Sequence, residues 1–205
     1  MVSKIDTAWD LFLEGKTSEA KKLVEQDFSI DTCTDFSLLN LMGYLLLAEK
    51  DYASCTHIFE KYILLAQQNE DKENEHIGLH QLAMIYRDQG DFHKALKLIE
   101  DEEKIVEEHF PNDNLKKAVN NYEQGYVRLK LNNLDEALTF MNLSLEQSLE
   151  TDDVISQACS YRGLGEIYLA FGDTQLAKIH FEKAIELFKS VDESEGIKEI
   201  EKLMT

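Results

Sequence analysis

The chain has 205 residues, a single proline and a formal net charge of −19. This charge disfavours binding to nucleic acids and to anionic membrane surfaces, because both draw on clustered Lys and Arg. No stretch approaches the roughly 20 apolar residues of a membrane-spanning helix, and Asp6 and Asp10 interrupt the N-terminal segment where a signal peptide would be apolar. With three cysteines at unrelated spacings, we expect a cytoplasmic protein with reduced thiols.

A small residue is followed twelve positions later by another small residue at five places. The pairs are Ala8 with Ala20, Gly43 with Cys55, Ala83 with Ala95, Gly125 with Ala137, and Gly165 with Ala177. A turn signal separates the members of each pair, at residues 14–16, 49–51, 89–91, 132–134 and 171–173. Such a period is typical of stacked helical hairpins, none of which can bury its apolar face alone. We therefore predict one all-α domain, 1–205, with hairpins at about 1–34, 35–70, 73–112, 114–150 and 153–190.

The first hairpin is the least regular, and its assignment depends on Ala8, Gly15 and Ala20. The third hairpin is the clearest, because apolar residues recur at three- and four-residue steps on both sides of Gly90. We expect Gly90, and Gly172 in the fifth hairpin, to close helices in the left-handed conformation. After the fifth hairpin a three-residue apolar stripe predicts a capping helix over 192–204.

The fifth hairpin repeats the third almost position for position, with Leu164-Gly165, Tyr168, Gly172-Asp173, Ala177 and Phe181. This spacing resembles the tetratricopeptide repeat. The units here are about 40 residues long rather than about 34, like the long repeats of kinesin light chains and bacterial peptide-sensing regulators. The resemblance implies a right-handed α-solenoid, in which the first helices of successive hairpins line a concave groove and the second helices face outward.

Helix geometry then selects the side chains of the groove, on the face opposite the stripe that packs against the second helix. The candidate peptide-binding residues are Trp9, Asn40, Tyr44, His80, Gln81, Met84, Arg87, Tyr122, Tyr126, Lys130, Arg162 and Glu166. Amides and hydroxyls of this kind can satisfy the backbone of an extended peptide, while aromatic rings supply contact area. Arg87 and Arg162 could pair with a carboxylate of the ligand. The alternative interpretation is that the tyrosines only pack between repeats and the arginines only neutralise nearby Asp and Glu.

The leading functional hypothesis is a non-enzymatic scaffold that binds a peptide or protein segment in this groove, without cofactor or metal. A second hypothesis is a sensor for a small signalling peptide that acts through a separate effector protein. A metal-dependent enzyme is a third, since His76 and His80 lie four residues apart on a helix. The sequence also leaves open the formation of a homodimer.

Overall fold

A computed structural model describes residues 3–204, and within this range the chain forms eleven helices and no strand. The helices belong to two compact units, of which the first ends at Asp91 and the second begins at Phe92. The expected first hairpin and the expected domain begin at residue 1, so their first two residues, like residue 205, lie outside the described range. The all-α repeat class is confirmed, and the single domain stays a prediction.

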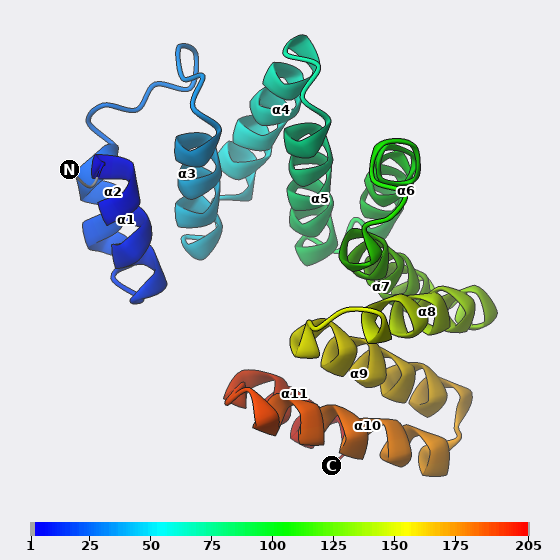
Figure 1. Cartoon of the computed structure of the whole chain (residues 1–205). Coiled ribbons are helices and arrows are strands. Elements are labelled where there is room, and N and C mark those ends of the chain that lie inside the picture. The colour runs from blue at the N-terminus through cyan, green and yellow to red at the C-terminus, as the bar shows by residue number, and fades with distance from the viewer. Residues whose placement is uncertain (1–2, 205) are drawn as a thin grey trace. The chain divides into compact units, whose positions relative to one another are not determined.

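The first unit is built of five helices that follow one another as packed neighbours (Figure 1). Helix α1 packs against α2, and both contact α3. Helix α3 packs in turn against α4, and α4 against α5. The bounds are α1 (Lys4–Leu13), α2 (Thr17–Val24), α3 (Phe36–Ala48), α4 (Tyr52–Gln68) and α5 (Lys72–Asp88). A longer irregular connection, residues 25–35, joins α2 to α3.

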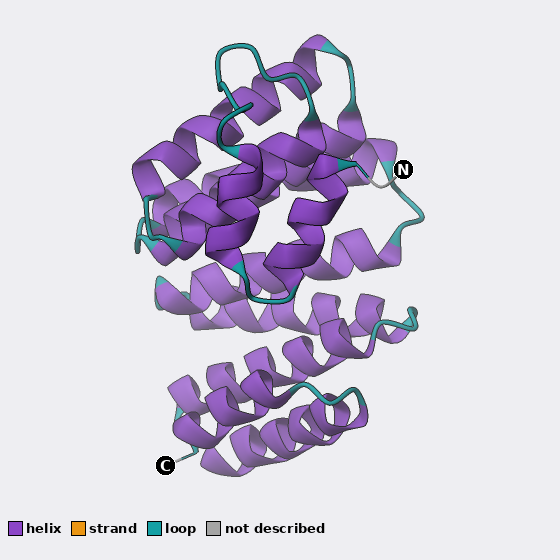
Figure 2. Cartoon of the chain, turned by 90° about the vertical axis from the view of Figure 1, so that its left-hand side faces the viewer, coloured by secondary structure: helices purple, strands orange, loops and turns teal. Residues whose placement is uncertain are grey.

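The second unit continues the same pattern with longer and more uniform helices. Consecutive helices pack against each other from α6 to α11, and α9 also contacts α7 and α11. The bounds are α6 (Phe92–His109), α7 (Asn114–Lys130), α8 (Leu134–Leu149), α9 (Val154–Phe171), α10 (Thr174–Ser190) and α11 (Ser194–Leu203). Short loops connect these helices (Figure 2), so each hairpin is defined almost entirely by its two helices and one turn.

All ten members of the small-residue pairs are buried, and in the second and fifth pairs the glycine lies directly against the second helix of its hairpin. A Cβ atom on Gly43 would lie 2.4 Å from Cε2 of Phe59, and one on Gly165 would lie 2.5 Å from Cδ1 of Phe181. In the second pair the thiol of Cys55 donates a hydrogen bond to the carbonyl of Gly43 over 3.3 Å. The aromatic ring of the second helix therefore fills the space that a larger side chain on the first would need.

Each of the five predicted turns closes with one residue at positive φ. Three of these residues are Gly15, Gly90 and Gly172, with φ between 77° and 82°. The other two are Lys50 (φ 59°) and Asn132 (φ 63°), although a side chain makes this conformation unfavourable. The same turn thus recurs where the sequence lacks the glycine that would mark it.

Aspartate caps the N-termini of most helices. Carboxylates of Asp35, Asp51, Asp71, Asp113, Asp153 and Asp173 each accept a hydrogen bond from the backbone N–H three residues later, at 2.6–3.2 Å. These bonds satisfy one of the N–H groups that a helix start leaves without an intrahelical partner. Ser3 caps α1 and Glu193 caps α11, whereas no side chain caps α2 or α8. Helix α11 begins at Ser194 rather than at the predicted residue 192.

We predict that Gly165→Ala will lower the free energy of unfolding by about 1–3 kcal/mol, because the added methyl group meets the buried ring of Phe181. Urea denaturation followed by circular dichroism measures the change. Combined with Phe181→Leu, the substitution is expected to cost less than the sum of the two single changes. Full additivity, or an unchanged midpoint for Gly165→Ala, would contradict this account of the helix contact.

We also predict that Lys50→Gly will raise the free energy of unfolding by about 0.5–1 kcal/mol, because glycine adopts positive φ without the steric conflict of a Cβ atom. The matched control is Gly172→Ala, which introduces a Cβ atom at the equivalent turn and is expected to lower stability. Thermal unfolding of both variants shows whether Lys50→Gly raises stability and whether Gly172→Ala lowers it. Equal effects of the two substitutions would argue against a shared turn.

Candidate functional site

Three aromatic rings form one surface cluster in the first unit. Trp9 and Phe12 project from α1, and Tyr44 projects from α3, with all three ring-centroid distances at 5.9 Å. The indole N–H of Trp9 donates to the hydroxyl of Ser37 over 2.9 Å. None of the three rings is fully buried, so the cluster offers apolar contact area that is already held in place.

Two amide side chains lie on the same side of the first unit. Asn40 is one turn before Tyr44 on the same face of α3, and Gln81 of α5 donates a hydrogen bond to the Tyr44 hydroxyl. Burial raises the pKa of Tyr44, and this hydrogen bond opposes part of the increase. The carbonyl oxygen Oδ1 of Asn40 is buried and accepts no hydrogen bond from any residue of the described range. Side chains of α1, α3 and α5 therefore lie close to one another here.

The remaining candidates of the first unit lie along α5. His80, Met84 and Arg87 are all partly exposed. The guanidinium of Arg87 lies 3.3 Å from a carboxylate oxygen of the adjacent Asp88, so part of its charge is already compensated.

The candidate binding residues of the second unit form hydrogen bonds and ion pairs with one another. Arg162 of α9 donates to the hydroxyl of Tyr122 on α7 over 2.6 Å. Its guanidinium also pairs with Glu199 of α11, and its Nε lies 3.8 Å from Glu166. Lys130 of α7 approaches the same Glu166 carboxylate, at 3.6 Å. Helices α7, α9 and α11 are thus joined across this face by one polar network.

Aromatic contacts complete this network. The rings of Tyr122 and Tyr126 stack at 6.2 Å, and the ammonium of Lys130 lies 4.6 Å from the centroid of Tyr126. Burial raises the pKa of Tyr122 above the usual tyrosine range. The side chains of Arg162 and Glu166 are only 17% and 13% exposed. In this unit the observed contacts match the alternative interpretation, in which the arginine neutralises nearby acids and the tyrosines pack between repeats.

Sequence reasoning missed a buried row of polar residues on α7. Asn120, Gln124 and Arg128, one turn apart, are each less than 10% exposed. The three side chains are hydrogen-bonded in sequence, from Arg128 to Gln124 over 2.9 Å and from Gln124 to Asn120 over 3.0 Å. Their four-residue spacing is visible in the sequence, but only the contact with α6 shows that this face is buried rather than solvated.

His76, one of the two histidines of the hypothetical metal site, lies beside an acidic side chain. His76 is buried, and its Nε2 lies 3.5 Å from a carboxylate oxygen of Glu73. No group of three or more His, Cys, Asp and Glu side chains placed to hold a metal ion occurs in residues 3–204. Over the same residues no helix combines the length and the apolar character needed to cross a bilayer.

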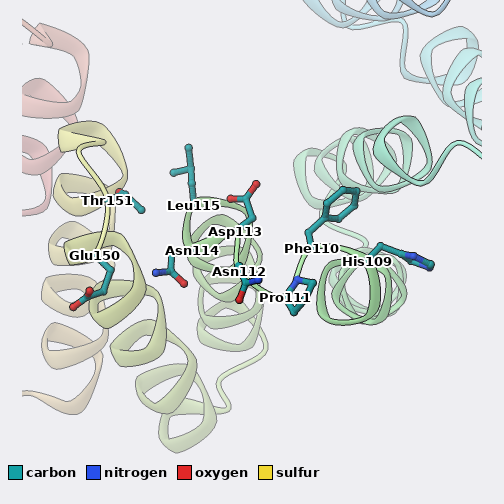
Figure 3. Close-up of a pocket in the computed structure, with 9 residues that line it drawn as sticks. All are labelled: His109, Phe110, Pro111, Asn112, Asp113, Asn114, Leu115, Glu150 and Thr151. Carbon is teal, nitrogen blue, oxygen red and sulfur yellow. The ribbon is translucent and has the colours of Figure 1, made fainter.

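A wide depression of about 600 Å³ lies at the loop ends of the second unit. Residues 109–115, which join α6 to α7, face Glu150 and Thr151 after α8 (Figure 3). The carboxylate of Asp113 caps α7, and the apolar Pro111 and Leu115 lie beside the amides of Asn112 and Asn114. The lining mixes acidic, amide, aromatic and aliphatic side chains and defines no particular ligand chemistry.

Comparison with known proteins identifies the repeats. Family models described as tetratricopeptide repeat match residues 114–190 and 78–101. A search of curated protein sequences finds no match.

Solved structures resemble the chain over most of its length. BtubC (BKLC) from P. vanneervenii is 17% identical, with 92% of this chain and 80% of that one covered and a TM-score of 0.74. A structure of putative kinesin light chain TPR-like repeats from Podosopora anserina is 17% identical, covering 93% and 96%, with a TM-score of 0.70. MamA 41-end from Desulfovibrio magneticus RS-1 is 19% identical, covering 93% and 98%, with a TM-score of 0.62. At these identities the likeness shows the fold alone.

We predict that Arg162→Gln will lower the free energy of unfolding by about 1–3 kcal/mol, because it leaves Glu199 and the Tyr122 hydroxyl without their cationic partner and leaves Glu166 with Lys130 alone. Lys178→Gln is the matched control. It breaks another pair with a four-residue spacing, Lys178 with Glu182, whose side chains are 64% and 59% exposed, and should change stability by less than about 0.5 kcal/mol. Urea titrations of both variants separate the two cases, and equal effects would disprove a structural role for Arg162.

Proposed function

The chain is a tetratricopeptide repeat protein, and from this premise we propose that it binds an extended segment of another protein on the first unit. Its repeats support a role as a protein-interaction scaffold. The finer proposal is that the binding surface consists of the aromatic cluster of Trp9, Phe12 and Tyr44 together with the amides of Asn40 and Gln81. The scaffold is proposed to act without catalysis.

The observation that carries this proposal is the carbonyl oxygen of Asn40. A buried acceptor without a hydrogen bond is disfavoured by about 1–3 kcal/mol, and the Oδ1 atom of Asn40 has no donor among the described residues. Asn40 itself is partly exposed, so a turn of its amide toward the surface would let this oxygen accept the backbone N–H of an extended peptide. The rings beside it provide the apolar contact that gives a bound segment most of its affinity.

The second unit offers a less accessible surface of the same kind. A ligand carboxylate would have to displace Glu166 or Glu199 from Arg162. Exchanging one carboxylate for another gains little free energy, whereas filling the vacant acceptor of Asn40 gains a hydrogen bond. We therefore propose the first unit as the principal site, with Tyr122, Tyr126, Lys130, Arg162 and Glu166 contributing to the array's rigidity.

The proposal is tested by selecting binders from a library of random 12-residue peptides displayed on phage, and measuring their Kd by fluorescence polarisation. Asn40→Ala is expected to raise Kd about tenfold, which corresponds to about 1.4 kcal/mol. The same substitution should leave the free energy of unfolding unchanged or slightly higher, because it removes an acceptor that has no partner in the unbound protein.

Lys130→Ala in the second unit is the control and should leave Kd unchanged. Tyr44→Ala provides a second test on the first unit and is expected to weaken binding at least as much as Asn40→Ala. If the library yields no binder, or if the binders tolerate both Asn40→Ala and Tyr44→Ala, the first unit is not the peptide site.

A further inference from the structure

A second cavity in the second unit, separate from the proposed peptide surface, has an unusual polar lining. It has a volume of about 290 Å³ and lies among helices α6, α7 and α8. Glu103, Val106 and Glu107 come from α6. Asn120 and Asn121 come from α7, with Lys117 one turn before them, and Gln147 comes from α8. The cavity is thus formed between elements of one compact unit.

One wall of this cavity is held rigidly by buried amides. Asn120 is 1% exposed, and its amide donates to the carbonyl of Ile99 over 3.0 Å while its Oδ1 accepts from Gln124. Gln124 is fully buried, and its side-chain amide opposes part of the rise that burial causes in the pKa of the nearby Glu103 carboxyl. Glu103 therefore lies beside a side chain that cannot itself move into solvent.

The carboxylates in the cavity form no close ion pair with a residue in the described range. Glu103 and Glu107 lie one turn apart on α6, and the charge of Arg128 acts on Glu103 only from beyond ion-pair distance, where it opposes part of the rise that burial causes in the pKa of that carboxyl. Burial raises the pKa of Glu103, and the charge of Glu107 adds to the increase. A cation that binds a carboxylate in such surroundings gains more interaction free energy than one that binds a fully hydrated carboxylate.

The nearest cationic side chains are engaged elsewhere. The ammonium of Lys117 donates to the carbonyl of Pro111. The guanidinium of Arg128 contacts Glu100 at 3.2 Å and Glu136 at 3.3 Å. The charges of Glu103 and Glu107 therefore remain available to a ligand.

The amides near the opening add a further acceptor. The Nδ2 atom of Asn121 donates to Oε1 of Gln147 over 2.8 Å, which leaves the carbonyl oxygen of Asn121 able to accept. The cavity thus presents two carboxylates and an amide oxygen, beside the aliphatic side chain of Val106. A ligand that matches this set carries several N–H donors, no acceptor and a short apolar part.

We propose that this cavity binds a guanidinium group on a short aliphatic stem. A guanidinium is planar and presents five N–H donors, so it can bridge two carboxylates and an amide oxygen at once, whereas an ammonium concentrates three donors on one nitrogen. Val106 contacts the stem. The group is supplied either by a free alkylguanidine or by an arginine side chain of another protein, and the chemistry recognised in the cavity is the same.

The test uses the full chain labelled with ¹⁵N and three probes: butylguanidinium, butylammonium and the blocked tripeptide Gly-Arg-Gly. Butylguanidinium is expected to shift the side-chain amide signals of Asn121 and Gln147, and to bind several-fold more tightly than butylammonium in calorimetry. The tripeptide distinguishes the sources, because a site for protein arginine binds it at least as well as butylguanidinium, and a site for a free alkylguanidine does not.

Glu103→Gln with Glu107→Gln is expected to raise the Kd of butylguanidinium at least tenfold. The matched control is Glu182→Gln with Glu186→Gln, which removes the same charge at the same spacing from an exposed face of α10 and should change Kd by less than twofold. Equal weakening by both double variants would mean non-specific attraction to an acidic protein. That result, or amide signals of Asn121 and Gln147 that do not move, would overturn the proposal.

Discussion

The close approach of paired helices at small residues is the contact on which the rest of the structure depends. Gly43 admits the ring of Phe59 and Gly165 admits the ring of Phe181, so an aromatic side chain in a space without a Cβ atom holds each of these two hairpins together. This contact fixes the rotation of both helices about their axes. The remaining faces of each helix are determined as a result, including the face that carries the aromatic cluster in the first unit and the face that carries the polar network in the second.

The two units use that face in different ways. In the first unit, aromatic rings are partly exposed and the Oδ1 atom of Asn40 is left without a donor. In the second, charged side chains of α7, α9 and α11 compensate one another. A buried row of amides and an arginine also replaces apolar packing where α7 meets α6. Polar contacts of this kind contribute less to stability than apolar burial, but they require one particular arrangement of the side chains.

Local patterns in the sequence predicted the hairpins well. They did not predict contacts between side chains that are far apart in the sequence. The turns at Gly90 and Gly172 follow from glycine's tolerance of positive φ. The same turn at Lys50 could be predicted only from its place in the repeat. The partners of Arg162 could not be predicted, because Tyr122 and Glu199 are 40 and 37 residues away and the contacts depend on how successive helices stack. The missing donor of Asn40 is likewise a property of the packed structure and has no local signal.

Part of the chain's large negative charge belongs to the aspartates that cap helices. Six of these carboxylates sit at helix N-termini, where the aligned peptide dipoles place partial positive charge. Hydrogen bonds to the following backbone N–H and side chain accordingly lower the pKa of Asp51 and Asp71. Around a helix start the partial positive charge of the backbone reduces the local effect of the capping carboxylate, whereas the net charge of −19 that acts at long range is unchanged. At close range a cationic ligand is therefore attracted more strongly by the carboxylates that lie away from helix starts.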